Sequence, residues 1–166
     1  MMYPSESDTR PSESSAWFSF MMGEFEAKFP RDRSYITNHM WAKKRDAGGW
    51  CFGLTAYAVR LLQDVYFLDW LVEPKSHLVV RQNLGSIESK KAESDLFAPA
   101  AGHLIDLNEK VLSDPSLINA DPYGDGWMLA IQIETEDGLL SPDEYLLHLE
   151  KAWDVAQKTI KGQANH

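Results

Sequence analysis

Two segments of the chain alternate apolar positions with mixed ones, residues 65–73 and residues 126–134. A period of two is typical of β-strands, because successive side chains point to opposite faces of a sheet. Residues 121–126 carry the proline and glycines of tight turns. We therefore predict two strands, each with one apolar side. These sides consist of Tyr66, Leu68, Trp70 and Val72 in the first segment, and of Trp127, Leu129, Ile131 and Ile133 in the second.

Two other segments have the signals of helices. Residues 55–64 lack glycine and proline and begin with Thr55, a good N-cap, so a short helix is expected there. Near the C-terminus, Ser141 and Glu144 form a capping box, with Pro142 at the first helical position. A helix is therefore expected after Ser141, with one apolar stripe that packs on the sheet. The stripe consists of Tyr145, Leu149, Ala152, Trp153, Ala156 and Ile160.

The beginning of the chain differs from the rest in composition. Residues 3–15 are nearly all polar and include two prolines, so they cannot bury enough surface to offset the entropy of ordering, and we predict a disordered tail. Residues 16–29 are rich in aromatics and methionine, and their apolar spacing predicts a short helix that docks on the body or on a partner. The predicted organisation is a partly disordered N-terminal extension over 1–33, a mainly β body with short helices over 34–140, and a C-terminal helix over 141–166.

Composition narrows the function classes. A chain of 166 residues with 44% hydrophobic content suits one domain with a tail. The net charge of −9 disfavours binding to nucleic acid or to an anionic membrane surface. No apolar run is long enough to span a bilayer, and the N-terminus lacks the basic and apolar regions of an export signal. With Cys51 as the only cysteine, no intramolecular disulfide can form, and we expect a cytoplasmic protein.

The sequence offers no conventional active site. It contains none of the motifs of nucleophile elbows, zinc proteases, P-loops or dinucleotide-binding folds. Cys51, between Trp50 and Phe52, is interpreted as a small buried apolar residue. A self-contained enzyme that uses Cys51 or His39 stays open as an alternative. The histidines lack metal-ligand spacing, so no metal site is expected; they are His39, His77, His103, His148 and His166.

The stretch GSIESKKAESD, residues 85–95, is the strongest candidate for a functional site. The apolar residues on both sides predict two strands, so that Lys90, Lys91 and Ala92 lie at the tip of a hairpin. A lysine at such a tip is exposed and held in fixed register, which suits a prosthetic group attached as an amide to its side-chain nitrogen. The alternatives are a solvated turn without function and an interaction module whose lysine stays unmodified.

This stretch resembles the lipoylation motif of the glycine cleavage system H protein, a small lipoyl carrier. The family motif has the form E-S-V-K-A-x-S-D, and residues 88–95 are ESKKAESD, so Lys91, not Lys90, matches the modified lysine. The resemblance implies a lipoyl/biotinyl-type hammerhead β-barrel of two antiparallel sheets with a C-terminal helix, and lipoate attached covalently to Lys91. Four further blocks occur in the family's order and spacing: FGLTAYA at 52–58, QDVYFL at 63–68, APAAG at 98–102 and LINADPYGDGW at 117–127.

One block departs from the family. H proteins commonly carry S-H-E-W near the N-terminus, where the acid lines the cavity that receives the aminomethyl group, but residues 38–41 are NHMW. Burying an amine without an anionic or hydrogen-bonding partner is costly, and Met40 offers neither, although Asp95 remains available. Asn38, His39 and Met40 are therefore the cavity candidates. With this departure the chain resembles the H-protein-like lipoate-binding proteins that serve cytoplasmic sulfur oxidation beside a heterodisulfide-reductase-like complex.

The resemblance implies a carrier without catalytic residues of its own. The predicted function is a lipoamide arm on Lys91 that shuttles sulfur-bound intermediates between enzymes of cytoplasmic sulfur oxidation. The alternative is a glycine cleavage H protein that carries the aminomethyl group from glycine decarboxylase to aminomethyltransferase. The implied partners are a lipoate ligase or transferase, together with the heterodisulfide-reductase-like complex and lipoamide dehydrogenase, or else the glycine cleavage P, T and L proteins. Glu88, Glu93 and Asp95 are candidates for recognition by the ligase or a partner, unless this acidic rim serves only solubility.

Overall fold

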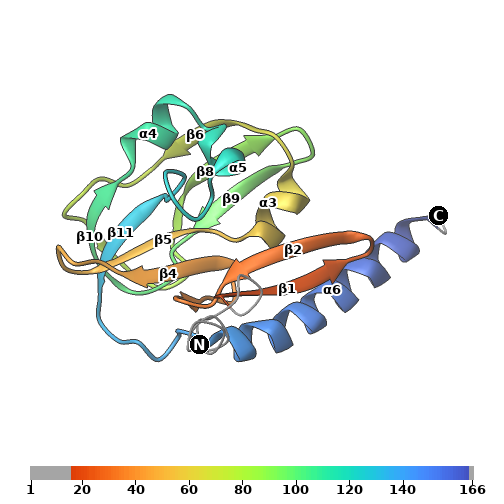
Figure 1. The fold of residues 1–166 in the computed structure, drawn as a ribbon. Coiled ribbons are helices and arrows are strands. Elements are labelled where there is room, and N and C mark those ends of the chain that lie inside the picture. The colour runs from red at the N-terminus through yellow and green to blue at the C-terminus, as the bar shows by residue number, and fades with distance from the viewer. Residues whose placement is uncertain (1–15, 165–166) are drawn as a thin grey trace, which may run out of the picture.

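The computed structural model describes residues 16–164, so the tail predicted over 3–15 lies outside the described residues. Strands dominate the fold and form three antiparallel sheets (Figure 1). In chain order the elements are β1 (Trp17–Met22), β2 (Phe25–Pro30), β3 (Ser34–Tyr35), β4 (Met40–Lys44), β5 (Trp50–Leu54), α3 (Ala56–Leu62), β6 (Val65–Trp70), β7 (His77–Leu78), β8 (Asn83–Ser89), β9 (Glu93–Phe97), β10 (Gly102–Leu107), α4 (Glu109–Ser113), α5 (Leu117–Ala120), β11 (Leu129–Ile133) and α6 (Pro142–Ala164).

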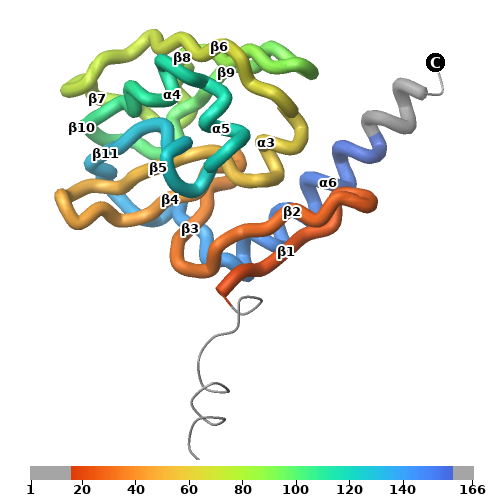
Figure 2. The backbone as a smooth tube through the Cα atoms, turned by 45° about the horizontal axis from the view of Figure 1, so that its top comes forward, coloured from red at the N-terminus to blue at the C-terminus, as the bar shows by residue number. Residues whose placement is uncertain are grey.

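Two of the sheets enclose the main hydrophobic core. One has six strands in the order β3-β4-β5-β11-β10-β7, and the other has three in the order β6-β8-β9 (Figures 1 and 2). Buried side chains from both sheets form the core, among them Phe52 and Ile131 from the larger sheet and Leu68 and Ile87 from the smaller one. The predicted mainly β architecture with two antiparallel sheets is therefore confirmed.

The apolar side predicted for residues 65–73 is wrong in detail. The pairing of β6 with β8 shifts register immediately after Val65, and such a bulge changes which side chains face the core. Val65 and Leu68 are buried, whereas Tyr66 is 64% exposed. In β11 the three consecutive residues Leu129–Ile131 are all buried, so both faces of this strand are covered rather than the single face predicted.

Both helices predicted from capping signals are present. Thr55 caps α3, where its side chain accepts a 3.5 Å hydrogen bond from the amide of Ala58. At the start of α6, the Ser141 amide donates to Oε1 of Glu144 at 2.8 Å, and the Glu144 amide donates to Oγ of Ser141 at 3.2 Å, which is a complete capping box. The predicted stripe faces inward through the fully buried Tyr145. Neither α6 nor any other helix within residues 16–164 is long and apolar enough to cross a membrane.

Residues 16–29 do not form the predicted helix. They form most of a β-hairpin, β1 and β2, in which Met22 pairs with Phe25 across a tight turn. Gly23 in that turn has a φ of 66°, a left-handed conformation that glycine adopts without strain. The apolar spacing satisfies a period of two as well as the helical period. Met21, which a helical stripe would bury, is 50% exposed, whereas Met22 is 6% exposed.

This N-terminal hairpin, residues 17–30, packs with α6 in a second hydrophobic cluster. Phe29 is fully buried and stacks on Phe18 with ring centroids 5.0 Å apart. Tyr35 of β3 stacks on Tyr145 of α6 at 4.6 Å with nearly parallel rings. Figures 1 and 2 show β1 and β2 running alongside α6. The hairpin therefore docks on the body, and α6 joins the body through the same cluster.

Candidate functional site

The stretch predicted to carry the functional lysine is a hairpin of β8 and β9, residues 83–97, called here the lysine hairpin. The strand pairing ends at Glu88 and Glu93, and hydrogen bonds between Ser89 and Ala92 enclose a two-residue tip formed by Lys90 and Lys91. The Ser89 amide donates to the Ala92 carbonyl at 2.8 Å. The Ser89 hydroxyl donates to the same carbonyl at 3.1 Å and accepts from the Ala92 amide at 3.2 Å. These bonds close the turn and fix the position of its tip.

The two lysines differ in how their backbone is held. The amide of Lys90 donates to the carbonyl of Asp64 at 2.8 Å, which ties the tip to the loop before β6. Both lysine side chains are exposed, and neither makes an ion pair or a hydrogen bond with another residue in the described range 16–164. Lys91 thus presents an exposed side chain at the tip of a hydrogen-bonded turn.

Acidic residues surround the tip. Glu88 and Glu93 are directly opposed across β8 and β9, and like charges in this position destabilise a sheet by up to about 1 kcal/mol. Glu88 is half-buried, while Glu93 and Asp95 are exposed. The hairpin thus places three carboxylates beside the two tip lysines.

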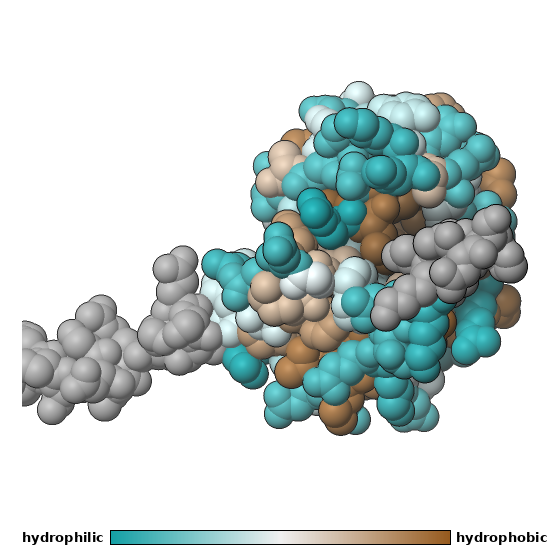
Figure 3. Space-filling model, turned by 90° about the vertical axis from the view of Figure 1, so that its right-hand side faces the viewer, coloured by the Kyte–Doolittle hydropathy of each residue, from teal (hydrophilic) through white to brown (hydrophobic). Residues whose placement is uncertain are grey.

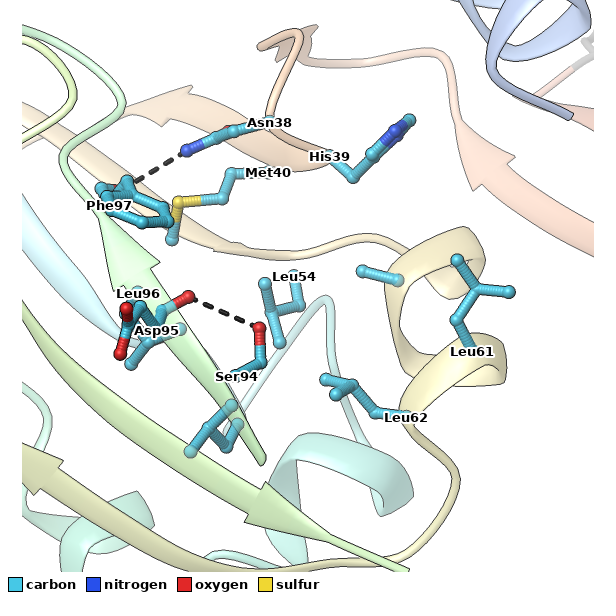
Figure 4. A pocket seen from close by; sticks show the side chains of 12 residues that line it. Asn38, His39, Met40, Leu54, Leu61, Leu62, Ser94, Asp95, Leu96 and Phe97 are labelled. Carbon is cyan, nitrogen blue, oxygen red and sulfur yellow. Dashed lines mark hydrogen bonds between the residues drawn. The ribbon is translucent and has the colours of Figure 1, made fainter. Parts of the chain in front are cut away.

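A pocket of about 230 Å³ lies at the base of the lysine hairpin and is called here the hairpin pocket (Figure 4). Its walls come from the turn before β4, from β5, from α3, and from β8 and β9. Figure 3 views the molecule from the side on which α3 and the hairpin tip lie, and hydrophobic residues line a hollow on that side. The apolar lining includes Met40, Leu54, Leu61, Leu62, Ile87 and Leu96.

The structure brings the three cavity candidates and Asp95 to this pocket. Asn38, His39 and Met40 all belong to its lining, as does Asp95 from β9. The Asn38 side-chain nitrogen donates to the carbonyl of Phe97 at 3.2 Å and so joins the turn before β4 to the end of β9. Met40 is 3% exposed, and its sulfur points toward Phe97 (Figure 4). The other two rim acids, from the hairpin tip, do not line the pocket.

His39 borders the pocket, but its ring points away from it (Figure 4) and toward the hydroxyl of Tyr145. Its Nδ1 lies 2.9 Å from the hydroxyl of Tyr145, which is also 3.0 Å from Oγ1 of Thr55. Its ring lies 4.4 Å from that of Tyr57. Burial, with a smaller effect from His148, lowers the pKa of His39 to about 4. The ring is therefore neutral near pH 7 and supplies no charge to the pocket.

The polar groups that face the pocket are neutral. Ser94 and Leu96 share one face of β9 and Asp95 lies on the other, because side chains alternate along a strand. In Figure 4 the Asp95 carboxylate accordingly points away from Leu54. The Ser94 hydroxyl donates to the Asp95 backbone carbonyl at 3.3 Å and keeps its own lone pairs. It offers an uncharged acceptor, and Asn38 also lines the pocket, while the Asp95 carboxylate stays at the margin.

The other chemistry-bearing residues take no part in this site. Cys51 is half-buried in β5, and burial raises the pKa of its thiol to about 11, so the thiol stays protonated at neutral pH. His77 pairs with Glu134 at the surface, with 2.7 Å between the side-chain atoms. Across the described part of the chain, no group of three or more His, Cys, Asp or Glu residues is arranged to hold a metal ion.

Sequence reasoning missed the wall that α3 contributes. Leu61 is 47% exposed and lines the pocket beside Leu62. Leu61 and Leu62 project about 100° apart around the helix axis. Leu62 also packs against the main core, whereas Leu61 lies at the exposed edge of the pocket. The apolar pattern of the helix alone does not show that these two leucines border a cavity.

Comparisons with known proteins give a consistent result. A family model described as glycine cleavage H-protein matches residues 33–159. The glycine cleavage system H protein of Carboxydothermus hydrogenoformans is 38% identical over 125 residues, which cover 74% of this chain and 95% of that protein. The protein of the same name from Rubrobacter xylanophilus is 39% identical over 126 residues, covering 75% and 98%.

A solved structure agrees with these sequence matches. The crystal structure of a glycine cleavage system H protein from Mycobacterium marinum superimposes with a TM-score of 0.63 at 35% identity, covering 70% of this chain and 95% of that chain. The N-terminal hairpin precedes the residues that the family model matches.

Proposed function

This chain belongs to the glycine cleavage H-protein family, and from that premise we propose that Lys91 is its lipoyl attachment site and that its arm serves aminomethyl transfer in glycine cleavage. Members of the family are non-catalytic carriers with lipoate attached covalently to a lysine. The observation that carries the proposal is the exposed, unpaired Lys91 at the hairpin tip, with the hairpin pocket at the base of the same hairpin.

The residues around the tip fit a lipoyl group. The amine of Lys91 is accessible for amide formation, and the small side chain of Ala92 leaves room for the modifying enzyme. The hairpin pocket, about 230 Å³ with largely apolar walls, suits a hydrocarbon chain and its sulfur-containing ring. When attached, the group supplies a redox-active disulfide that takes up and releases cargo. The chain's own residues hold the root of the arm in register and exclude water from what enters the pocket.

The acidic rim fits recognition by basic partners. Amidation of Lys91 would change the net charge of the chain from −9 to −10 and leave the tip wholly acidic except for Lys90. Glu88, Glu93 and Asp95 would then meet cationic side chains on the lipoate ligase or transferase and on the P, T and L proteins. Because these contacts are between exposed charges, binding should weaken as salt increases.

The cargo favoured by the comparisons is the aminomethyl group, since the relatives and the solved structure described above all carry the glycine cleavage name. Its amine needs hydrogen-bond acceptors once it is shielded from water. Ser94 offers a neutral acceptor in the pocket, Asn38 also lines it, and Asp95 lies at the margin. The pocket can therefore accept the amine in its uncharged form despite the presence of Met40.

Sulfur transfer is the second candidate function, and Met40 is the observation that favours it. A buried thioether in an apolar wall suits a soft, uncharged sulfur cargo better than an ammonium group. The partners would then be a heterodisulfide-reductase-like complex and lipoamide dehydrogenase. None of the relatives described above has a name that refers to sulfur oxidation, so this candidate has less support than glycine cleavage.

Reconstitution with a matched pair of variants tests the proposal. Lys91→Arg and Lys90→Arg each keep the positive charge and remove a primary amine at adjacent positions of one turn. The full chain and both variants are incubated with lipoate ligase and weighed by intact mass spectrometry, and each is then supplied to the P, T and L proteins with glycine. We expect the unsubstituted chain and Lys90→Arg to gain one lipoyl group and to support release of carbon dioxide, and Lys91→Arg to do neither.

Other outcomes separate the two parts of the proposal. Lipoylation of Lys91→Arg, with loss of lipoylation in Lys90→Arg, would refute Lys91 as the attachment site. A lipoylated chain that fails to support glycine cleavage but takes up sulfane sulfur would overturn the cargo assignment in favour of the second candidate. A chain that no ligase modifies would contradict both candidates.

A further inference from the structure

A basic surface lies at the end of the body opposite the lysine hairpin. It consists of Arg31, Arg33, Lys43, Lys44 and Arg45. Figures 1 and 2 both show the connection from β4 to β5, which begins at Arg45, at the far end of the molecule from the tip of β8 and β9. Five of the 16 lysines and arginines thus gather at one place in a chain of net charge −9.

Arg33 is the fixed centre of this surface. Its side chain is only 8% exposed, and its guanidinium group lies 4.7 Å from the ring of Trp41 and 5.6 Å from that of Tyr123. It donates to the Asp32 carboxylate at 2.9 Å and to the Tyr123 carbonyl at 3.2 Å. Stacking and hydrogen bonding of this kind hold a positive charge in one position. Asp32 also accepts a hydrogen bond from Lys43 at 3.0 Å.

Two neighbouring clefts open on the basic surface, with volumes of about 200 and 360 Å³. Both clefts are lined by Arg33, Lys43 and Lys44, and Asp32 is the only acidic residue in either lining. Within residues 16–164, neither Lys44 nor Arg45 forms an ion pair. Two positive charges at the clefts are therefore left without a carboxylate partner from the described chain.

An open sheet edge runs through the same surface. β3 pairs with β4 only through Ser34 and Tyr35, so the ladder on the outer side of β4 ends at Ala42. Lys43 and Lys44 continue the pairing only on the inner side, with β5. Lysines on an open edge often serve to keep other strands away. That role explains neither the stacked arginine nor the paired clefts, which indicate a surface that receives a ligand.

We propose that the basic surface docks an acidic segment of a partner protein, rich in aspartate and glutamate, while the lysine hairpin stays free. Arginine and lysine form charge-assisted hydrogen bonds with carboxylates, which are the anionic groups that a protein segment itself carries. The negative charge of the remaining surface repels an acidic partner from every other approach, so the partner is oriented toward this end. This goes beyond the carrier function, and it does not depend on modification of Lys91.

The consequence is a carrier that can hold two partners at once. A component bound at the basic surface leaves the tip of the lysine hairpin accessible to a second enzyme, because the two lie at opposite ends of the body. Retention at one site raises the effective concentration of the arm at the other. The two surfaces carry opposite charge, so the acidic rim of the lysine hairpin fits a basic partner and the basic surface fits an acidic one.

Binding of a fluorescein-labelled hexaglutamate peptide to the full chain tests this inference. The variant Lys44→Glu/Arg45→Glu is compared with Lys75→Glu/Lys151→Glu, which makes the same change in net charge at exposed lysines elsewhere. Fluorescence anisotropy at low ionic strength should show affinity at least about tenfold weaker in the first variant and changed by less than about threefold in the second. In NMR spectra the peptide should shift the indole signal of Trp41 and leave that of Trp70, in β6, unchanged.

Lys91→Ala should bind the peptide as the unsubstituted chain does, which separates this inference from the proposed function. Equal weakening in both double variants would overturn the proposal, because it would mean that only net charge matters. Absence of peptide binding at low salt, or NMR shifts confined to the lysine hairpin, would overturn it as well. Salt-dependent self-association in sedimentation, abolished by Lys44→Glu/Arg45→Glu, would identify the occupant as a second copy of the chain and also contradict the proposal.

Discussion

Replacing Tyr145 by phenylalanine removes a single hydroxyl from behind the hairpin pocket. Tyr145 is fully buried, and its hydroxyl lies 2.9 Å from Nδ1 of His39 and 3.0 Å from Oγ1 of Thr55. His39 belongs to the turn that carries Met40, and Thr55 caps α3, so this one hydroxyl joins two walls of the pocket. Burial raises the pKa of Tyr145 far above its usual value, so the phenol remains neutral.

The expected cost follows from the number of partners each buried hydroxyl has. Tyr145→Phe loses two hydrogen bonds, each worth about 1 kcal/mol, so the free energy of unfolding should fall by about 2 kcal/mol. Tyr35→Phe loses one bond, a 2.5 Å contact with the carbonyl of Pro30, and should cost about 1 kcal/mol. Tyr57 is 2% exposed, but its hydroxyl has no hydrogen-bond partner within residues 16–164. Tyr57→Phe should therefore cost about 0.5 kcal/mol or less.

Urea unfolding followed by tryptophan fluorescence measures all three variants on one scale. A loss of about 2 kcal/mol should lower the midpoint by roughly 1 M urea for a domain of this size. The three rings belong to one aromatic cluster and keep their stacking after substitution, so the comparison isolates the hydroxyl groups. If Tyr145→Phe costs no more than Tyr57→Phe, the Tyr145 hydroxyl does not tie the pocket walls together.

Three further outcomes follow from burial, charge and backbone geometry. His39 stays neutral in the folded protein down to about pH 4, whereas in the unfolded chain it takes up a proton below about pH 6.5. His39 alone should therefore lower the free energy of unfolding by up to about 3 kcal/mol as the pH falls from 6.5 to 4. Asparagine tolerates the φ of 68° at this position, so His39→Asn is the variant of choice. The difference in free energy of unfolding between pH 7 and pH 4.5, measured with urea, should be smaller in this variant. An unchanged difference would mean that His39 does not cause the loss of stability in acid. Phe29→Ala should cost about 3–5 kcal/mol in the same assay, whereas an effect below about 1 kcal/mol would mean that the N-terminal hairpin is not part of the core. Gly85→Ala would bring a Cβ within 2.0 Å of the Asp69 carbonyl oxygen, so it should separate β6 from β8 and lower the melting temperature sharply; a near-normal melting temperature would show that the strands can shift.

The lysine hairpin could be predicted because its signals are local. Polar residues and two lysines interrupt two apolar segments, and a tip of two residues needs no information from the rest of the chain. The capping box at Ser141 and Glu144 is local in the same sense, and it marks the start of α6 correctly. The family resemblance then selected Lys91 over Lys90, which the turn geometry alone does not do.

The N-terminal hairpin could not be predicted from spacing alone. Its apolar residues satisfy both the helical and the strand period, so the choice depends on what the segment packs against. Phe29 meets Tyr145, more than a hundred residues away in the sequence, and Phe18 stacks on Phe29 in the same cluster, so long-range packing favours the strand. Gly23 was the one local signal for a turn, since the chain reverses there with a positive φ.

The hairpin pocket depends even more on long-range packing. Asn38 from the turn before β4, Leu61 from α3 and Ser94 from β9 meet in it, although no local pattern links them. The direction of Asp95 depends on strand register, and one residue of slip would have turned its carboxylate into the pocket. The sequence therefore indicated which residues to consider for the cavity but not which of their atoms face it.

Peptide-level mass spectrometry of the protein purified from its native cells, without reductant, would show whether Lys91 carries a lipoyl group and what is bound to its sulfurs. We expect a lipoyl group on Lys91 and an unmodified Lys90, with an aminomethyl adduct on the lipoyl sulfur in protein taken from cells that are degrading glycine. Additional sulfur in place of the aminomethyl group would contradict the cargo assignment and support sulfur transfer. An unmodified Lys91 would contradict the carrier function itself.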